Sequence, residues 1–255
     1  MSRPVNSQDL GTMASAARSS SPMAPMDTSS PRAKVEKTGV LYSPFGTQDM
    51  VTMAMGENFV RLAKGKLPYD IILPKEEHAA FNKNLGQMAA QKQRGRSKEE
   101  DLELDSLSHL QKSLSGPERL GRLDPAHSKL YVMGHGDSGS DTLSATVRAN
   151  SRTVDAQKLS SQLSGLHPQY MDVRALSCNS ADPASSGAVP FAQHLANVMG
   201  ATHPDLTVTG YRGEHMMAPD VHHHEQGNLD GKGVNQHQTS RRSTVSAAFT
   251  PLKLK

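Results

Sequence analysis

The chain has 255 residues, of which 35% are hydrophobic and 4% aromatic, and its formal net charge is +3. This composition is lean for a globular chain of that length, so part of it is expected to stay unfolded. The single cysteine, Cys178, excludes an intrachain disulfide and a multi-cysteine zinc site. No apolar run reaches the roughly 20 residues that span a bilayer. No zinc-finger spacing or aromatic RNA-binding motif indicates nucleic acid as a partner.

Residues 1–38 are predicted to be a disordered tail. Residues 1–36 are rich in Ser, Ala, Met and Pro and contain no aromatic residue. Such a segment cannot bury enough apolar surface to offset the entropy lost on ordering. A plain flexible tail accounts for it. The more specific hypothesis is a bacterial type III export signal, which it resembles in composition. That hypothesis places the protein outside the bacterium, in the cytoplasm of a host cell.

From residue 39 onward the sequence predicts alternating strands and helices. Runs of apolar residues predict strands at 39–43, 69–74, 129–136, 171–180 and 205–211, with a short strand or turn at 141–147. Apolar residues at helical spacing predict helices at 48–64, 75–93, 99–116, 153–166 and 190–200. Thr47 or Asp49 is expected to cap the first helix, and Ser151 or Thr153 the fourth. The alternation predicts an α/β fold with a mostly parallel sheet flanked by helices.

Two residues with catalytic chemistry follow successive strands of this sheet. His135 lies in a Gly-His-Gly sequence after the apolar run that begins at Lys129, and Cys178 follows the next long strand. Because one crossover helix joins the two strands, both residues are expected at the same carboxyl edge. A thiol needs a base or a cationic neighbour to become a nucleophilic thiolate, and His135 can supply it. The pattern offers a Cys–His pair with an oxyanion hole from the backbone N–H groups near Gly136 and Cys178, beside the plainer reading that a lone Cys is a small buried hydrophobe and the placement a coincidence.

The sequence Gly-Asp-Ser-Gly at 136–139 offers Ser138 as an alternative nucleophile. A chymotrypsin-like chain consists of two all-β barrels with its histidine upstream, whereas this chain alternates helices and strands. A nucleophile elbow needs Gly-x-Ser-x-Gly, and here the second glycine comes one residue too early. Ser138 is therefore disfavoured as a nucleophile. Asp137 and Ser138 are instead expected to shape the loop after His135 through turn hydrogen bonds.

The segments "KLYVMGHG" at 129–136 and "MDVRALSCNSA" at 171–181, separated by a helix, resemble the caspase-like cysteine peptidases. They are more similar to the inositol-hexakisphosphate-activated cysteine peptidase domain of RTX-type bacterial toxins. The resemblance covers roughly residues 39–255 and implies one caspase-like domain there, with a C-terminal β-hairpin flap. It implies that His135 is the catalytic histidine and Cys178 the nucleophile. Those toxin domains cleave the giant chains that contain them, whereas this chain is short. A stand-alone virulence effector is therefore expected, with a protein or peptide substrate for which a host protein is one candidate.

The same resemblance implies inositol hexakisphosphate as an allosteric activator, which needs a crowded basic pocket. The candidate ligand residues are Lys129, Arg212, Lys232, Arg241, Arg242 and Lys253, followed by Lys255 and, more weakly, Arg148 and Arg152. From residue 206 onward, six Lys or Arg stand against four Asp or Glu, an excess that scattered surface charge also explains. The run "DVHHHEQG" at 220–227 contains His222, His224 and Glu225. Adjacent loop histidines point in different directions, so no metal site is predicted.

Two other kinds of function stay open on the sequence. One is a non-catalytic effector that binds inositol phosphates or phosphoinositides through the same basic residues. The other is a thiol-dependent acyltransferase, a class that commonly orders His, an acidic residue and Cys on a different fold, and for which no acidic partner stands out here.

Overall fold

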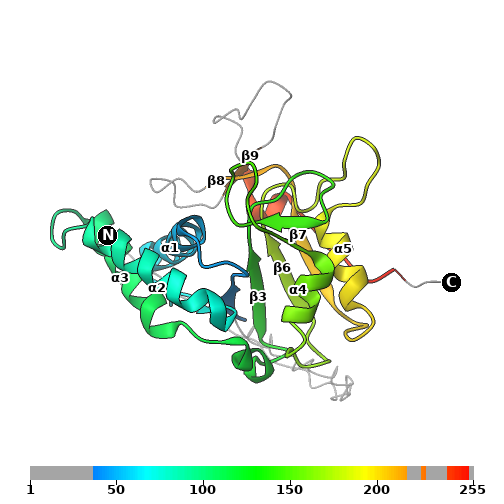
Figure 1. Cartoon of the computed structure of the whole chain (residues 1–255), viewed down its shortest axis with the longest axis horizontal. Helices are drawn as coiled ribbons and strands as arrows, with labels where there is room; N and C mark the ends of the chain where they lie inside the picture. The colour runs from blue at the N-terminus through cyan, green and yellow to red at the C-terminus, as the bar shows by residue number, and fades with distance from the viewer. Residues whose placement is uncertain (1–36, 217–224, 228–239, 253–255) are drawn as a thin grey trace, which may run out of the picture. The chain divides into compact units, whose positions relative to one another are not determined.

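The structure of this chain is a computed structural model that describes residues 37–216, 225–227 and 240–252 (Figure 1). The predicted tail up to residue 36 lies outside the described residues, as do Lys232, Lys253 and Lys255. The first strand begins at Thr38, one residue before the boundary expected for the folded domain.

A six-stranded sheet forms the centre of the fold, in the order β11-β7-β6-β3-β1-β2. Every neighbouring pair is parallel except β11 with β7. The mostly parallel α/β sheet predicted from the sequence is therefore confirmed. Its strands are β1 (Thr38–Tyr42), β2 (Asp70–Ile72), β3 (Ser128–Met133), β6 (Asp172–Leu176), β7 (Thr207–Tyr211) and β11 (Ser246–Phe249).

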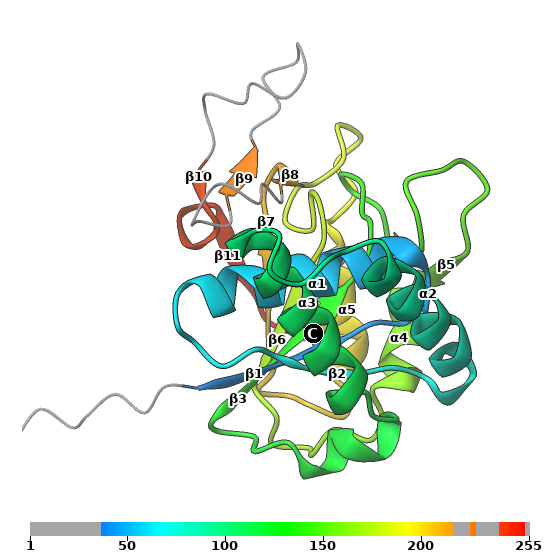
Figure 2. The same cartoon turned by 90° about the vertical axis from the view of Figure 1, so that its left-hand side faces the viewer.

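Helices cover both faces of the sheet. From β1 the chain moves outward to β2, whereas from β3 it moves the other way through β6 to β7. Because parallel crossovers are right-handed, the helix of the first connection lies on the opposite face from the helices of the later ones. The two helices between β2 and β3 pack against the helix of the first connection. Figures 1 and 2 show the first group on one face and the second group on the other. The groups are α1 (Gln48–Ala63), α2 (His78–Ala90) and α3 (Lys98–Ser113), then α4 (Ala156–Gln162) and α5 (Phe191–Met199).

The central strands consist largely of apolar residues because helices cover both faces of the sheet. In β1, Leu41 and Tyr42 are fully buried, and so are Leu130 and Val132 in β3. Short 3-10 helices lie at Lys75–Glu77 (η1), Pro117–Arg122 (η2) and Arg242–Thr244 (η3). Within the described residues, no helix combines the length and the apolar character that crossing a bilayer requires.

The predicted helix at 153–166 begins later than expected. Its first residues form β5 (Thr153–Asp155), which pairs in antiparallel fashion with β4 (Thr142–Ser144). The expected cap at Ser151 or Thr153 is wrong, because the side chain of Asp155 caps α4 by accepting a hydrogen bond from Lys158 N at 2.6 Å. The hairpin is favoured because it buries Val154, which a first helical turn would leave at the end of the helix.

Beyond β7 the chain forms a small antiparallel sheet at the base of the expected flap (Figure 2). Its strands are β8 (Glu214–Met216), β9 (Glu225–Gly227) and β10 (Ser240–Arg241). The β8–β9 pair is the predicted hairpin, and β10 adds a third strand to it. The following strand, β11, returns to the edge of the main sheet.

Candidate active site

The carboxyl ends of β3 and β6 place His135 and Cys178 at the same edge of the sheet. These strands are parallel neighbours, and their register pairs Met133 with Leu176. His135 and Cys178 each lie two residues beyond that pair, so the expectation of a shared edge is confirmed. The backbone of His135 exchanges two hydrogen bonds with Ser144, of 2.9 and 2.8 Å, which fixes the histidine against the end of β4.

The loop after His135 packs against the loop after Cys178, and this contact requires glycine. A Cβ atom on Gly136 would lie 2.7 Å from the carbonyl oxygen of Cys178, closer than real Cβ contacts allow. Gly139 has a φ of +67°, in the left-handed region, and its N–H donates to the carbonyl of Asp182 at 2.8 Å. Glycine at positions 136 and 139 therefore allows the loop after His135 to pack closely against the loop after Cys178.

Sequence reasoning missed the acidic partner of His135. Asp49 lies in the first turn of α1, and its Oδ2 is 3.2 Å from Nε2 of His135. This is an ion-pair distance without hydrogen-bond alignment. Thr47 occupies the N-cap position, but its hydroxyl donates to the carbonyl of Ala145 instead of to the helix. The side-chain cap expected from Thr47 or Asp49 is therefore wrong, because both side chains contact the histidine loop or its hairpin.

Hydrogen bonds from two neighbouring strands hold the Cys178 loop. Ser180 is buried, donates to the carbonyl of Ala175 at 2.8 Å and accepts from Tyr211 N at 2.9 Å. These bonds tie the loop to β6, where it begins, and to the end of β7. The cysteine itself is half-buried, so its thiol sits in a defined loop without being sealed in the core.

Gly213, the residue before β8 at the base of the flap, is hydrogen-bonded directly to the loop that contains Cys178. Asn179, which follows Cys178, has a left-handed φ of 51° and donates its N–H to Gly213 O at 2.7 Å. In return, Gly213 N donates to the carboxylate of Asp182 at 2.7 Å. Any movement of the flap base is therefore coupled mechanically to the residue next to the thiol.

The loop offers groups for an acyl-transfer reaction. The N–H of Gly136 donates no hydrogen bond to any described residue, which leaves a donor beside the Cys178 backbone. Asp137 and Ser138 are exposed in a turn that Ser140 N closes by donating to Asp137 O at 3.2 Å. The backbone of Asp137 therefore takes part in the expected turn, and the role expected for the Ser138 side chain stays a prediction. A nucleophile, a histidine with a carboxylate partner and a backbone donor are the components that thiol acyl transfer needs.

The predicted ligand residues occupy different environments. Lys129 is half-buried in β3, while Arg212 and Arg241 are exposed at either end of the flap segment. Arg242 is largely buried and pairs with the buried Glu57 of α1, with Nη2 at 2.6 Å from Oε1. The weaker candidate Arg152 forms a bidentate pair with Glu77, at 2.6 and 3.0 Å.

The structure adds two lysines that sequence reasoning did not select. Partial burial lowers the pKa of Lys64, which follows α1. The positive charges of Lys66, Arg242 and Arg241 lower it further and Glu57 opposes them, so these charged groups lie in the neighbourhood of Lys64. We call Lys64, Lys66, Arg241 and Arg242 the basic group. The only sequence signal for it was Lys-Gly-Lys at a helix end.

No cluster of His, Cys, Asp or Glu with metal-binding potential is found in the part of the chain that the structure describes. His222 and His224 lie outside it, and the side chain of Glu225 is not described. No protein-family model and no curated protein matches this chain. The class that the fold defines is therefore an α/β protein with a doubly wound, mostly parallel sheet.

Proposed function

We propose that this chain is a cysteine endopeptidase in which Cys178 is the nucleophile and His135 the proton-transfer group. The observation that supports it most is the meeting of the two loops at the carboxyl edge of β3 and β6, with Asp49 beside the histidine. In an open α/β sheet, ligands bind at this edge, where the strand order reverses. Here the order reverses between β1 and β3, the strands that lead to Asp49 and His135.

In the proposed reaction the Cys178 thiolate attacks the scissile carbonyl carbon and forms a tetrahedral intermediate. Gly136 N–H donates to its oxyanion. The carbon–nitrogen bond then breaks as protonated His135 gives its proton to the leaving amine, which leaves a thioester on Cys178. A water molecule, deprotonated by His135, hydrolyses the thioester and restores the thiol. The carboxylate of Asp49 favours the positively charged imidazole that both steps pass through.

Inositol hexakisphosphate is the proposed activator, and the basic group is where we place it. The positive charges gathered near Lys64 favour a polyanion, and the exposed Arg241 is accessible to it, whereas Arg242 already pairs with Glu57. Arg241 is the last residue of β10 at the base of the flap, and Arg242 follows it. A ligand bound there would act on the flap, whose other end Gly213 ties to the cysteine loop. Lys129, Arg212, Lys232 and Lys253 remain candidates from the resemblance. Binding would favour the ordered, reactive form of the site.

A protein or peptide is the proposed substrate, as the resemblance to cysteine peptidases implies. Action on a host protein after type III export accords with the composition of residues 1–36.

The test is covalent labelling of Cys178 by a thiol-reactive peptidyl probe, with and without inositol hexakisphosphate. Wild type is expected to be labelled faster with the ligand, and His135→Ala to lose about 100-fold or more of that rate at neutral pH, the usual size of a general acid–base contribution. Intact-mass analysis measures the rate. A labelling rate that changes neither with the ligand nor with His135→Ala would show that Cys178 is an ordinary thiol. The non-catalytic inositol-phosphate-binding effector would then be the better reading.

Asp49→Asn is expected to slow labelling of Cys178 about tenfold or more, because an adjacent carboxylate stabilises a cationic partner by at least that factor. Asp137→Asn is the matched control. It removes the same charge from an exposed position near the histidine, where the structure shows no contact with the imidazole. Equal effects of the two variants would assign the loss to general charge, and would contradict a specific role for Asp49.

A further inference from the structure

A cavity of about 870 Å³ lies at the opposite edge of the sheet from His135 and Cys178. It is formed at the amino ends of β1, β2 and β3, between the loop that follows α1 and the α3–η2 segment. Its volume falls in the range of pockets that enclose a whole small molecule. The proposed peptidase chemistry makes no use of it.

The walls of the cavity carry a positive charge. Among the lining residues, five are Lys or Arg and two are Asp, a net formal charge of +3 with the histidine neutral. Asp70, one of the two acids, already has partners, since Arg119 and Nε2 of His109 (3.0 Å) both contact its carboxylate. Its charge is therefore balanced within the wall.

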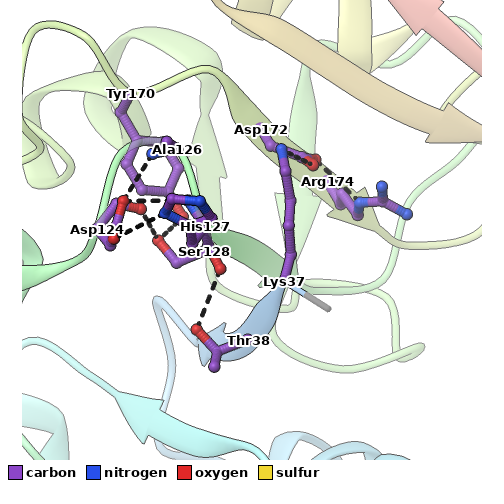
Figure 3. Close-up of polar contacts among 9 residues, drawn as sticks. All are labelled: Lys37, Thr38, Asp124, Ala126, His127, Ser128, Tyr170, Asp172 and Arg174. Atoms are coloured by element: carbon purple, nitrogen blue, oxygen red, sulfur yellow. Dashed lines mark hydrogen bonds and ion pairs between the residues drawn. The ribbon is translucent and has the colours of Figure 1, made fainter. Parts of the chain in front are cut away.

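The second acid, Asp124, is also satisfied by its own turn (Figure 3). Its Oδ1 accepts the backbone N–H groups of Ala126 and His127 at 2.9 and 3.1 Å, and its Oδ2 lies 3.0 Å from Nδ1 of His127. Lys37, at the rim, is engaged with Asp172, 3.2 Å away. Two further cationic side chains, those of Arg61 and Arg122, also line the cavity.

Arg61 is held in place while most of its donors are left unused. Its Nε donates to the carbonyl of Leu67 at 2.6 Å, and its Cζ lies 4.0 Å from the centroid of the Tyr69 ring. Within the described residues, neither Nη group donates a hydrogen bond. A guanidinium fixed by a carbonyl and a ring, with its fork open, is preorganised for a bidentate oxyanion such as phosphate.

We propose that this cavity binds a phosphate-bearing small molecule, with the phosphate on the fork of Arg61 and a second contact from Arg122. The side chain of Leu67 is 83% exposed at the rim, which gives the uncharged part of such a ligand an apolar surface to cover. The cavity adjoins the basic group at Lys66, but its other walls come from elements that contribute nothing to that group. The proposal does not depend on catalysis by Cys178.

The test is binding of inorganic pyrophosphate to the full-length chain at constant ionic strength, measured by calorimetry. Amide NMR shifts near Gly39 and Gly65 in the cavity wall locate the site. Arg61→Lys keeps the charge but loses the fork, and is expected to weaken binding about tenfold, the value of a charge-assisted hydrogen bond. Arg122→Ala, at an exposed position that leaves the fold intact, is expected to weaken it several-fold. Arg241→Ala, in the basic group, is the matched control and is expected to leave this binding unchanged.

Each alternative result overturns the proposal. Affinity that falls in Arg241→Ala but not in Arg61→Lys or Arg122→Ala would place the anion on the basic group. Citrate that binds as tightly as pyrophosphate, with the same dependence on Arg61, would make the site a carboxylate site. Absence of binding at millimolar pyrophosphate would remove the site altogether. None of these measurements depends on enzymatic activity, so a negative binding result would not contradict the peptidase proposal.

Discussion

Replacing Cys178 with alanine is expected to abolish peptide-bond cleavage by this chain. The thiol supplies the covalent bond to the acyl group, so its loss removes the reaction path and leaves no weaker version of it. Incubating a host-cell lysate with the protein and inositol hexakisphosphate, then labelling new peptide N-termini, measures the activity without knowledge of the substrate. Wild type is expected to create N-termini that are absent with Cys178→Ala. The half-buried position of Cys178 means that the alanine leaves only a small void, so the thermal midpoint should change little.

Ser138→Ala is the control for that experiment, because it removes the other nucleophile that the same loop offers. It is exposed and is expected to retain full cleavage. Cleavage that persists in Cys178→Ala and disappears in Ser138→Ala would exchange the roles of the two residues. Cleavage that both variants retain would show that neither is the nucleophile.

Replacing Glu57 with alanine is expected to cost about 3–5 kcal/mol of the free energy of unfolding. The Glu57 side chain is 2% exposed and that of Arg242 is 14% exposed, so the variant leaves an uncompensated charge in the interior. Burial lowers the pKa of Arg242, but the charge of Glu57 and its other neighbours outweigh burial and hold the pKa above its ordinary value. Because a guanidinium loses its proton only far above neutral pH, the arginine stays charged when Glu57 is removed. The thermal midpoint should fall by on the order of 10 °C, as calorimetry can measure.

Asp105→Ala is the matched control for Glu57→Ala. It breaks the Arg94–Asp105 pair, whose side chains are 59% and 53% exposed, and is expected to cost less than about 1 kcal/mol. The double variant Glu57→Leu with Arg242→Met is expected to recover most of the lost stability, since an apolar pair removes the unpaired buried charge. A loss in Glu57→Ala no larger than in Asp105→Ala would show that water reaches Arg242 in solution.

The sequence by itself predicted the parallel sheet and the edge shared by His135 and Cys178. These features are local or follow from one crossover: the apolar runs define the strands, and the connecting helix fixes the parallel direction. The sequence did not predict where α4 begins. Thr153–Asp155 is compatible with a first helical turn, and only its pairing with β4, which buries Val154, makes it a strand.

Only the tertiary structure decided which distant residues meet. Asp49 reaches His135 because β1 lies beside β3 and α1 begins where β1 ends, an order of strands that no local pattern encodes. Arg242 and Glu57, 185 residues apart, form a buried pair although the sequence marked the arginine only as a possible ligand contact. The periodicity of apolar residues indicates only which face of a helix or strand is buried. Which charged residues pair across the fold depends on how the helices and strands pack together, and that packing is determined by the burial of apolar surface over the whole chain.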